Sequence, residues 1–169
     1  MNRSSCSPVR EETMPAEFDA VVATHFGALG VRTEEDAIAE IRFLPPGTKT
    51  LEPRNALAAR ACLQLAAYLS DPKAGFDLPL KAAGTDFQRS VWRAIAAIPK
   101  GKTLTYGEIA RQLKSAPRAV GQACGRNPYP VVVPCHRVVA ADGGLGGFAS
   151  ATGGYLLDTK RWLLAHERG

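Results

Sequence analysis

A cysteine followed directly by a histidine and an arginine is the feature of this sequence best suited to chemistry. Cys135, His136 and Arg137 have valines on both sides, and three of the seven residues before the cysteine are prolines. The thiolate is the nucleophilic form of cysteine, and neighbouring cationic side chains lower the pKa of a thiol. The prolines restrict the backbone that leads to the thiol. The pattern therefore favours a nucleophilic Cys135 over a cysteine that only packs between two strands.

The composition is that of an ordinary globular protein. The chain has 169 residues, of which 46% are hydrophobic and 22% charged, enough for one domain or two small ones. No apolar stretch is long enough to span a membrane. Residues 1–12 lack the apolar core of a signal peptide. We therefore expect a cytoplasmic monomer in a reducing compartment, nuclear if the source is eukaryotic, with no membrane association.

The cysteines and histidines do not form a metal-binding pattern. Four cysteines stand at positions 6, 62, 124 and 135 without a Cys-x-x-Cys spacing, and the three histidines at 25, 136 and 166 complete no zinc motif. The sequence therefore predicts no metal and no cofactor.

Charge is divided unevenly along the chain. Residues 1–80 carry 8 Lys and Arg against 11 Asp and Glu, whereas residues 81–169 carry 13 against 5, within a total of +5. A basic half indicates a polyanionic partner, with nucleic acid the first candidate. A solvated basic surface without a partner explains the same count equally well.

The elements predict an α/β (α+β) fold in two parts. Residues 1–14 are expected to form a flexible tail and 15–80 an N-terminal α/β domain, joined by a short linker to a C-terminal domain of residues 84–169. In the first part, three short apolar runs between residues 18 and 44 predict an antiparallel β-meander. Apolar residues at a four-residue spacing predict an amphipathic helix over residues 55–69.

The second part is predicted to be mostly helical. Thr85 with Gln88, and Thr105 with Glu108, are capping-box patterns that open two helices. Pro117 suits the first turn of a third helix over residues 118–126. Helix, tight turn and helix, with basic residues on the second helix, is the outline of a helix-turn-helix. We expect this winged-helix-like unit to be followed by a loop that carries Cys135.

Four motifs in this part resemble a known family. They are Tyr106-Gly-Glu-Ile-Ala110, Arg118-Ala-Val-Gly121, Asn127-Pro128 and Pro134-Cys-His-Arg-Val-Val139. In this order and spacing they are similar to the O6-alkylguanine-DNA alkyltransferases, also called methylated-DNA–protein-cysteine methyltransferases. The resemblance covers about residues 84–167. It implies double-stranded DNA containing O6-alkylguanine as the partner, and irreversible transfer of the alkyl group to the protein's own cysteine.

The resemblance also implies roles for the catalytic residues. Cys135 accepts the alkyl group, His136 acts as its base through a bridging water, and Glu167 orients His136. Tyr106 helps to rotate the target phosphate and gives a proton to the leaving guanine. Asn127 is the hinge that ties the recognition helix to the cysteine loop.

Further residues are implied to contact the DNA and the flipped base. Arg118 fills the space that the base leaves in the stack. The DNA-contacting residues are Tyr106, Arg118, Ala119 and Gly121, and the pocket residues are Val138, Phe148, Ala149 and Ser150. Ala149 stands where the family has a guanine-contacting serine, so Ser150 is a candidate substitute. This departure leaves open the range of alkyl groups that the pocket accepts, as well as activity on O4-alkylthymine.

Two alternatives explain part of the pattern. An alkyltransferase-like protein binds damaged DNA without accepting the alkyl group, but such proteins lack the acceptor cysteine, which is present here as Cys135. A hydrolase with a Cys-His-Glu triad explains Cys135, His136 and Glu167. It does not explain the helix-turn-helix outline or the uneven charge.

Overall fold

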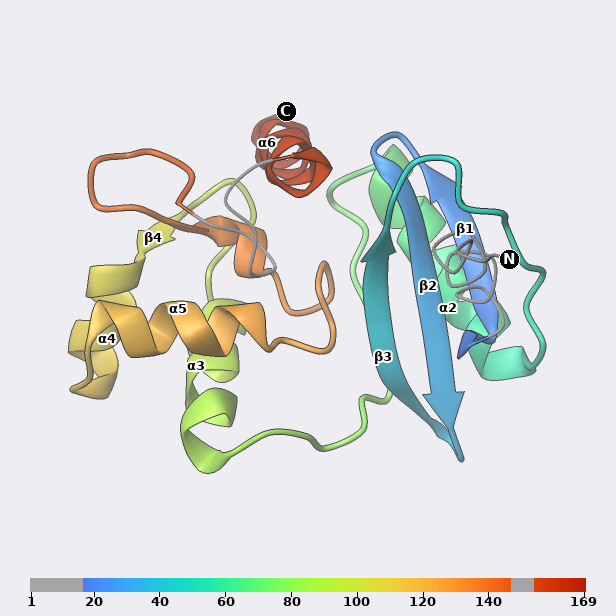
Figure 1. Cartoon of the computed structure of the whole chain (residues 1–169), viewed down its shortest axis with the longest axis horizontal. Helices are drawn as coiled ribbons and strands as arrows, with labels where there is room; N and C mark the ends of the chain where they lie inside the picture. Colours follow the sequence, from blue (N-terminus) through green and yellow to red (C-terminus); the bar gives the residue numbers. More distant parts are fainter. Residues whose placement is uncertain (1–16, 147–153) are drawn as a thin grey trace, which may run out of the picture.

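The two halves of the chain differ in architecture. In the computed structural model, which describes residues 17–146 and 154–169, a sheet-bearing first half stands beside a mostly helical second half (Figure 1). The mixture of a small antiparallel sheet and helices confirms the α/β (α+β) class. The expected tail, residues 1–14, lies outside the described residues, as do Phe148, Ala149 and Ser150.

The first half contains the predicted meander. Strands β1 (Ala20–Thr24), β2 (Gly27–Glu34) and β3 (Ala37–Leu44) form an antiparallel sheet in sequence order. Val22 pairs with Leu29, and Leu29 with Phe43. The short turns between the strands allow only this order of neighbours, so the sheet agrees with the sequence prediction.

Helix α2 (Ala56–Ser70) packs on this sheet and matches the predicted amphipathic segment. Asn55 caps its start by accepting a hydrogen bond from the Ala58 backbone N–H at 2.8 Å. Its buried face contains Ala61, Leu65 and Tyr68, at the spacing that brings side chains onto one side of a helix. Tyr68, near the end of α2, is only 1% exposed, and its hydroxyl binds Glu167 of the second half.

The second half contains four α-helices among its described residues. They are α3 (Asp86–Ala96), α4 (Tyr106–Leu113), α5 (Pro117–Gly125) and α6 (Tyr155–Arg168). Both predicted capping boxes are present, so the side chains that open α3 and α4 are those that the sequence indicated.

Helices α4 and α5 form the helix-turn-helix. Residues 114–116 join them, and Lys114 takes a left-handed conformation (φ 56°) that ends α4. Pro117 opens α5, as its missing N–H allows. The Trp92 indole N–H of α3 donates to the Ala123 carbonyl of α5 at 2.9 Å. The core of the second half thus determines where α5 lies.

The loop after α5 ends in a short 3₁₀ helix and a strand that the sequence analysis did not foresee. The 3₁₀ helix η2 (Cys135–Arg137) leads into β5 (Val138–Val139). Strand β5 pairs in parallel with β4 (Leu104–Thr105), which directly precedes α4. This pairing places the cysteine segment next to the start of the helix-turn-helix.

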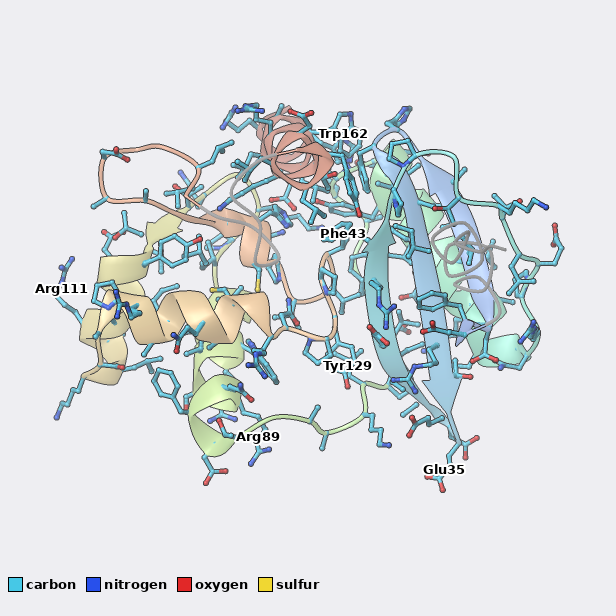
Figure 2. All side chains as sticks on the ribbon, in the orientation of Figure 1. Glu35, Phe43, Arg89, Arg111, Tyr129 and Trp162 are labelled. Carbon is cyan, nitrogen blue, oxygen red and sulfur yellow. The ribbon has the colours of Figure 1, made fainter. Side chains whose placement is uncertain are left out.

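Aromatic side chains fill the contact between the halves (Figure 2). The Phe26 ring lies 5.9 Å from that of Phe43 and 5.6 Å from that of Trp162 on α6, measured between centroids. Strand β3 also bonds to the loop after α5, because the Ile41 N–H donates to the Pro128 carbonyl at 2.8 Å. Within the part of the chain that the structure describes, no helix combines the length and apolar character needed to cross a membrane.

The capping box of α4 allows a first prediction. The Thr105 hydroxyl accepts from the Glu108 N–H at 3.0 Å, and the Glu108 carboxylate accepts from the Thr105 N–H at 2.7 Å. We expect Thr105→Ala to lower the free energy of unfolding by about 1 kcal/mol, because the cap bond is lost. Urea denaturation measures this change. Thr105→Ser is the matched control and should stay close to wild type, and an equal loss in both variants would contradict the role of the cap.

Candidate active site

Cys135 lies at the start of η2 and is 6% exposed. The Asn127 side-chain amide donates to the Cys135 Sγ at 3.0 Å, and the thiol in turn approaches the Cys124 carbonyl of α5 at 3.6 Å. The thiol is therefore held against the C-terminal end of α5 rather than within a strand.

Asn127 connects α5 to the cysteine loop. Its amide N–H group bonds both to Cys135 and to the Val133 carbonyl, the latter at 2.8 Å, while its side-chain oxygen accepts from the Tyr129 N–H at 2.9 Å. Its own backbone N–H donates to the Cys124 carbonyl at 3.2 Å. This geometry matches the hinge position that the resemblance implied for Asn127.

The loop holds one residue in an unfavourable conformation. Val131 has φ of 75°, a region that β-branched residues rarely enter. Strain of this kind persists only where surrounding contacts impose it and is common at functional sites. Here prolines 128, 130 and 134, together with the bond from the Val133 N–H to the Tyr129 carbonyl at 2.8 Å, restrict the loop.

His136 and Glu167 form the predicted pair. His136 is fully buried, and its Nε2 lies 2.9 Å from the Glu167 Oε2 at the end of α6. Because the carboxylate accepts, Nε2 carries the proton in the neutral ring and Nδ1 is left with the lone pair. Nδ1 is buried and has no hydrogen-bond partner among the residues that the structure describes. Burial lowers the pKa of His136, although the bond to Glu167 opposes this shift.

Arg137 binds the same carboxylate, which the sequence analysis did not foresee. Its Nε donates to the Glu167 Oε1 and its Nη2 to Oε2, both at 2.8 Å, while Nη1 donates to the Ile98 carbonyl at 2.6 Å. The fork geometry is the strongest form of ion pair between these side chains. The Tyr68 hydroxyl of α2 donates to Oε2 as well. The pKa of Glu167 lies below its usual range: burial alone would raise it, and the bonds from His136 and Arg137 outweigh that effect.

These contacts correct one expectation from the sequence. Adjacency indicated that His136 and Arg137 would lower the pKa of the Cys135 thiol, but both side chains point to Glu167 instead. The pKa of Cys135 is raised, by its interaction with the Cys124 thiol and by burial. The amide of Asn127 and the charge of Lys160 act in the opposite direction without overcoming these effects. The resting thiol is therefore protonated at neutral pH and needs a base.

Lys160 is a second group that the sequence analysis missed. It lies on α6 and is fully buried, its ammonium donates to the Leu145 carbonyl, and it stands 5.8 Å from the centre of the Tyr106 ring. Burial lowers the pKa of Lys160 to about 8, and its electrostatic interaction with Cys124 and Cys135 opposes the shift. Its position seven residues before Glu167, two helical turns away on one face of α6, was the available signal.

Tyr106 is the first residue of α4 and lies close to the cysteine. Burial, followed by the charges of Cys124 and Cys135, raises its pKa, so that the hydroxyl keeps its proton. A Cβ added to Gly121 would lie 4.0 Å from the Tyr106 ring, an ordinary van der Waals contact, so α5 passes close to the tyrosine here.

Three of the four predicted DNA-contacting residues, Arg118, Ala119 and Gly121, lie on α5, whereas Tyr106 lies on α4. Arg118 is exposed in the first turn of α5, and Ala119 next to it is half-buried. The described residues offer Arg118 no hydrogen bond or ion pair, so its side chain points to solvent. Of the predicted pocket residues, Val138 is fully buried in β5, directly after η2.

The described residues contain no group of three or more His, Cys, Asp or Glu placed to hold a metal ion. What the site contains is a buried thiol, a buried imidazole with a free lone pair and a charge-neutralised carboxylate, next to a helix-turn-helix. That set is able to deprotonate a nucleophile beside a nucleic-acid-binding element.

The chain is similar to known proteins of one family. Residues 86–169 match the family model of the 6-O-methylguanine DNA methyltransferase DNA-binding domain. A methylated-DNA–protein-cysteine methyltransferase of Methanosarcina acetivorans is 38% identical over 158 residues, which cover 89% of this chain and 97% of that protein. One from Mycolicibacterium paratuberculosis is 49% identical over 112 residues, 65% of either protein.

Solved structures agree with these matches. The crystal structure of Mycobacterium tuberculosis O6-methylguanine methyltransferase superimposes with a TM-score of 0.73 at 37% identity, covering 88% of this chain and 90% of that one. A structure of Mycobacterium tuberculosis OGT in complex with DNA gives a TM-score of 0.75 at 37% identity, with 88% and 91% covered. With nearly full-length similarity in sequence and in structure, this chain belongs to the family of the methylated-DNA–protein-cysteine methyltransferases.

Proposed function

We propose that this protein repairs DNA by direct reversal, and that Cys135 takes the alkyl group from the O6 atom of guanine. The observation that carries the proposal is the placement of Cys135 between the end of α5 and the His136–Glu167 pair, tied to α5 by Asn127. Docking of α5 on DNA thereby brings the damaged base to the nucleophile.

The transfer is a single displacement. The Cys135 sulfur attacks the alkyl carbon, a C–S bond forms, the carbon–O6 bond breaks, and its electron pair stays with guanine. The thiol loses one proton and guanine gains one, so that no net charge develops. Since the thioether does not hydrolyse, each molecule reacts once.

His136 is assigned to remove the thiol proton. Its Nδ1 lone pair is available, and one bridging water would connect it to the sulfur. Glu167 holds the ring in the tautomer with the proton on Nε2 and stabilises the imidazolium that forms. Lys160 favours the thiolate by its charge.

Tyr106 and Arg118 are assigned to the damaged guanine and to its removal from the stack. Because burial keeps the Tyr106 hydroxyl protonated, it can donate to the leaving guanine as negative charge develops there. Arg118, exposed in the first turn of α5, suits insertion into the stack after the nucleotide has turned out. Ala119, Gly121 and Val138 complete the proposed contacts, and we place Phe148, Ala149 and Ser150 at the pocket from the sequence alone.

The division of the chain into two domains and its cellular location are also proposals. We divide the chain into an N-terminal domain of residues 15–80 and a DNA-binding, alkyl-accepting domain of residues 84–169. A DNA substrate and free thiols at Cys62, Cys124 and Cys135 support an intracellular, reducing location. A cytoplasmic monomer remains our expectation.

The first test is the covalent product. When the protein is mixed with a duplex containing O6-methylguanine, we expect its intact mass to rise by one methyl group at one equivalent of DNA. Cys135→Ser should show no gain, because the nucleophile is lost. It should still bind the duplex in a salt-dependent manner, since phosphate contacts do not need the thiol. Binding without a mass gain by wild type would support the alkyltransferase-like alternative, and absence of DNA binding the hydrolase.

A second test concerns His136 as the group that takes the thiol proton. Because the pKa of His136 is lowered from the ordinary 6.5, the ring stays neutral, and able to take a proton, in mildly acidic solution. We expect the single-turnover transfer rate to reach half its plateau below pH 6.5 and to stay level above it. Rapid-quench measurements across the pH range give this profile. A rate that instead rises only near the ordinary thiol pKa of 9.0 would rule out His136 as the base.

A third test concerns Arg118. Turning a base out of the stack costs a few kcal/mol, and loss of about 1.4 kcal/mol of compensating contact slows a reaction about tenfold. We expect Arg118→Ala to slow transfer from duplex DNA by about that factor while leaving transfer from a single strand nearly unchanged. Arg111→Ala, which removes an exposed positive charge from α4 (Figure 2), is the charge-matched control. Equal slowing of both substrates by Arg118→Ala would contradict its insertion into the stack.

A further inference from the structure

Helix α2 of the first half contributes a side chain to the candidate site. Tyr68 is 1% exposed, and its hydroxyl donates to the Glu167 Oε2 across 99 residues of sequence. Its backbone carbonyl also accepts from the His166 Nε2 at 2.7 Å, and its ring stands edge-on to that of His166 at 5.3 Å. Two successive residues of α6 thus hold Tyr68 by its side chain and its backbone.

The Glu167 oxygen that Tyr68 binds is the one that faces His136. Among the described residues, Oε2 accepts from Tyr68, from the His136 Nε2 at 2.9 Å and from the Arg137 Nη2 at 2.8 Å, whereas Oε1 accepts only from the Arg137 Nε. A carboxylate oxygen offers about two lone pairs. Three donors therefore share Oε2, and each reduces the negative charge that the others receive.

We propose that Tyr68 is a positioning residue for the alkyl transfer, by which the first half of the chain holds Glu167 and limits how strongly that carboxylate stabilises a protonated His136. This inference rests on the proposed role of His136 as the base. The charged groups that face His136 are Glu167 and Lys160 from α6 and Arg137 from η2. Tyr68 is neutral, and its hydroxyl bond to Glu167 reduces the negative charge that Glu167 presents to His136.

The direction of the effect follows from the shared oxygen. Without the Tyr68 hydroxyl, the charge on Oε2 is divided between His136 and Arg137 alone, so the imidazolium is better stabilised. The pKa of His136 then rises, and less of the ring is neutral at a given acidic pH. The acid side of the transfer profile must move to higher pH.

The experiment compares two tyrosine variants of the full chain. Tyr68→Phe removes the hydroxyl that binds Glu167. Tyr129→Phe is the matched control, because Tyr129 is also buried and its hydroxyl donates to the Lys81 carbonyl, away from Glu167. We expect the midpoint of the pH profile for transfer from an O6-methylguanine duplex to rise by about half a pH unit in Tyr68→Phe. The midpoint of Tyr129→Phe should equal that of wild type.

A second substitution keeps the shape of the site. Site-specific 3-fluorotyrosine at position 68 makes the hydroxyl a stronger donor, so the midpoint should move below that of wild type. This variant also decides the matter if Tyr68→Phe does not fold. Opposite shifts in the two variants support the inference.

An unchanged midpoint overturns the inference. A purely structural role predicts lower thermal stability and a lower rate at every pH, with the midpoint in place. Failure of wild type to accept a methyl group at all would refute the proposed function instead, and direct NMR titration of His136 in wild type and Tyr68→Phe would then still test whether Tyr68 controls the imidazole.

Discussion

The buried carboxylate of Glu167 is the interaction on which the site depends. Its side chain is 1% exposed, and an ion removed from water costs several kcal/mol unless it is paired and hydrogen-bonded. Arg137 neutralises its charge, and His136 and Tyr68 both donate to Oε2. Since these donors come from η2 and α2, one carboxylate at the end of α6 joins the cysteine loop of the second half to helix α2 of the first half. Removal of Arg137 would leave this buried carboxylate without its charged partner.

The position of this carboxylate explains why the thiol of Cys135 stays protonated at rest. Because the His136 and Arg137 side chains bind Glu167, neither supplies a permanent counter-charge to the thiol, and interaction with Cys124 and burial raise the pKa of Cys135. A protonated, buried thiol is a poor target for oxidants. In the proposed mechanism the thiolate forms only by proton transfer to His136, which protects the single reactive group until DNA arrives.

Local patterns in the sequence were sufficient for most of the fold. The capping boxes at Thr85 and Thr105, the Pro117 start of α5 and the alternation of the meander all concern residues a few positions apart, so their structural effect is visible without tertiary contacts. The parallel pairing of β4 with β5 was not predictable in this way. Each strand has two residues, too few to show a periodicity, and the pairing joins segments more than thirty residues apart.

The sequence by itself determined the helix-turn-helix and the family, and it indicated Cys135 and His136 as the proposed nucleophile and base, because these features are encoded by residue types at short spacings. Only the tertiary structure decided which groups the charged side chains contact. Arg137 stands two residues from the thiol, yet it binds Glu167, and Tyr68 and Lys160 looked like ordinary helix residues until α2 and α6 were packed. The physical reason is that an electrostatic effect depends on distance and burial in three dimensions, which adjacency along the chain does not specify.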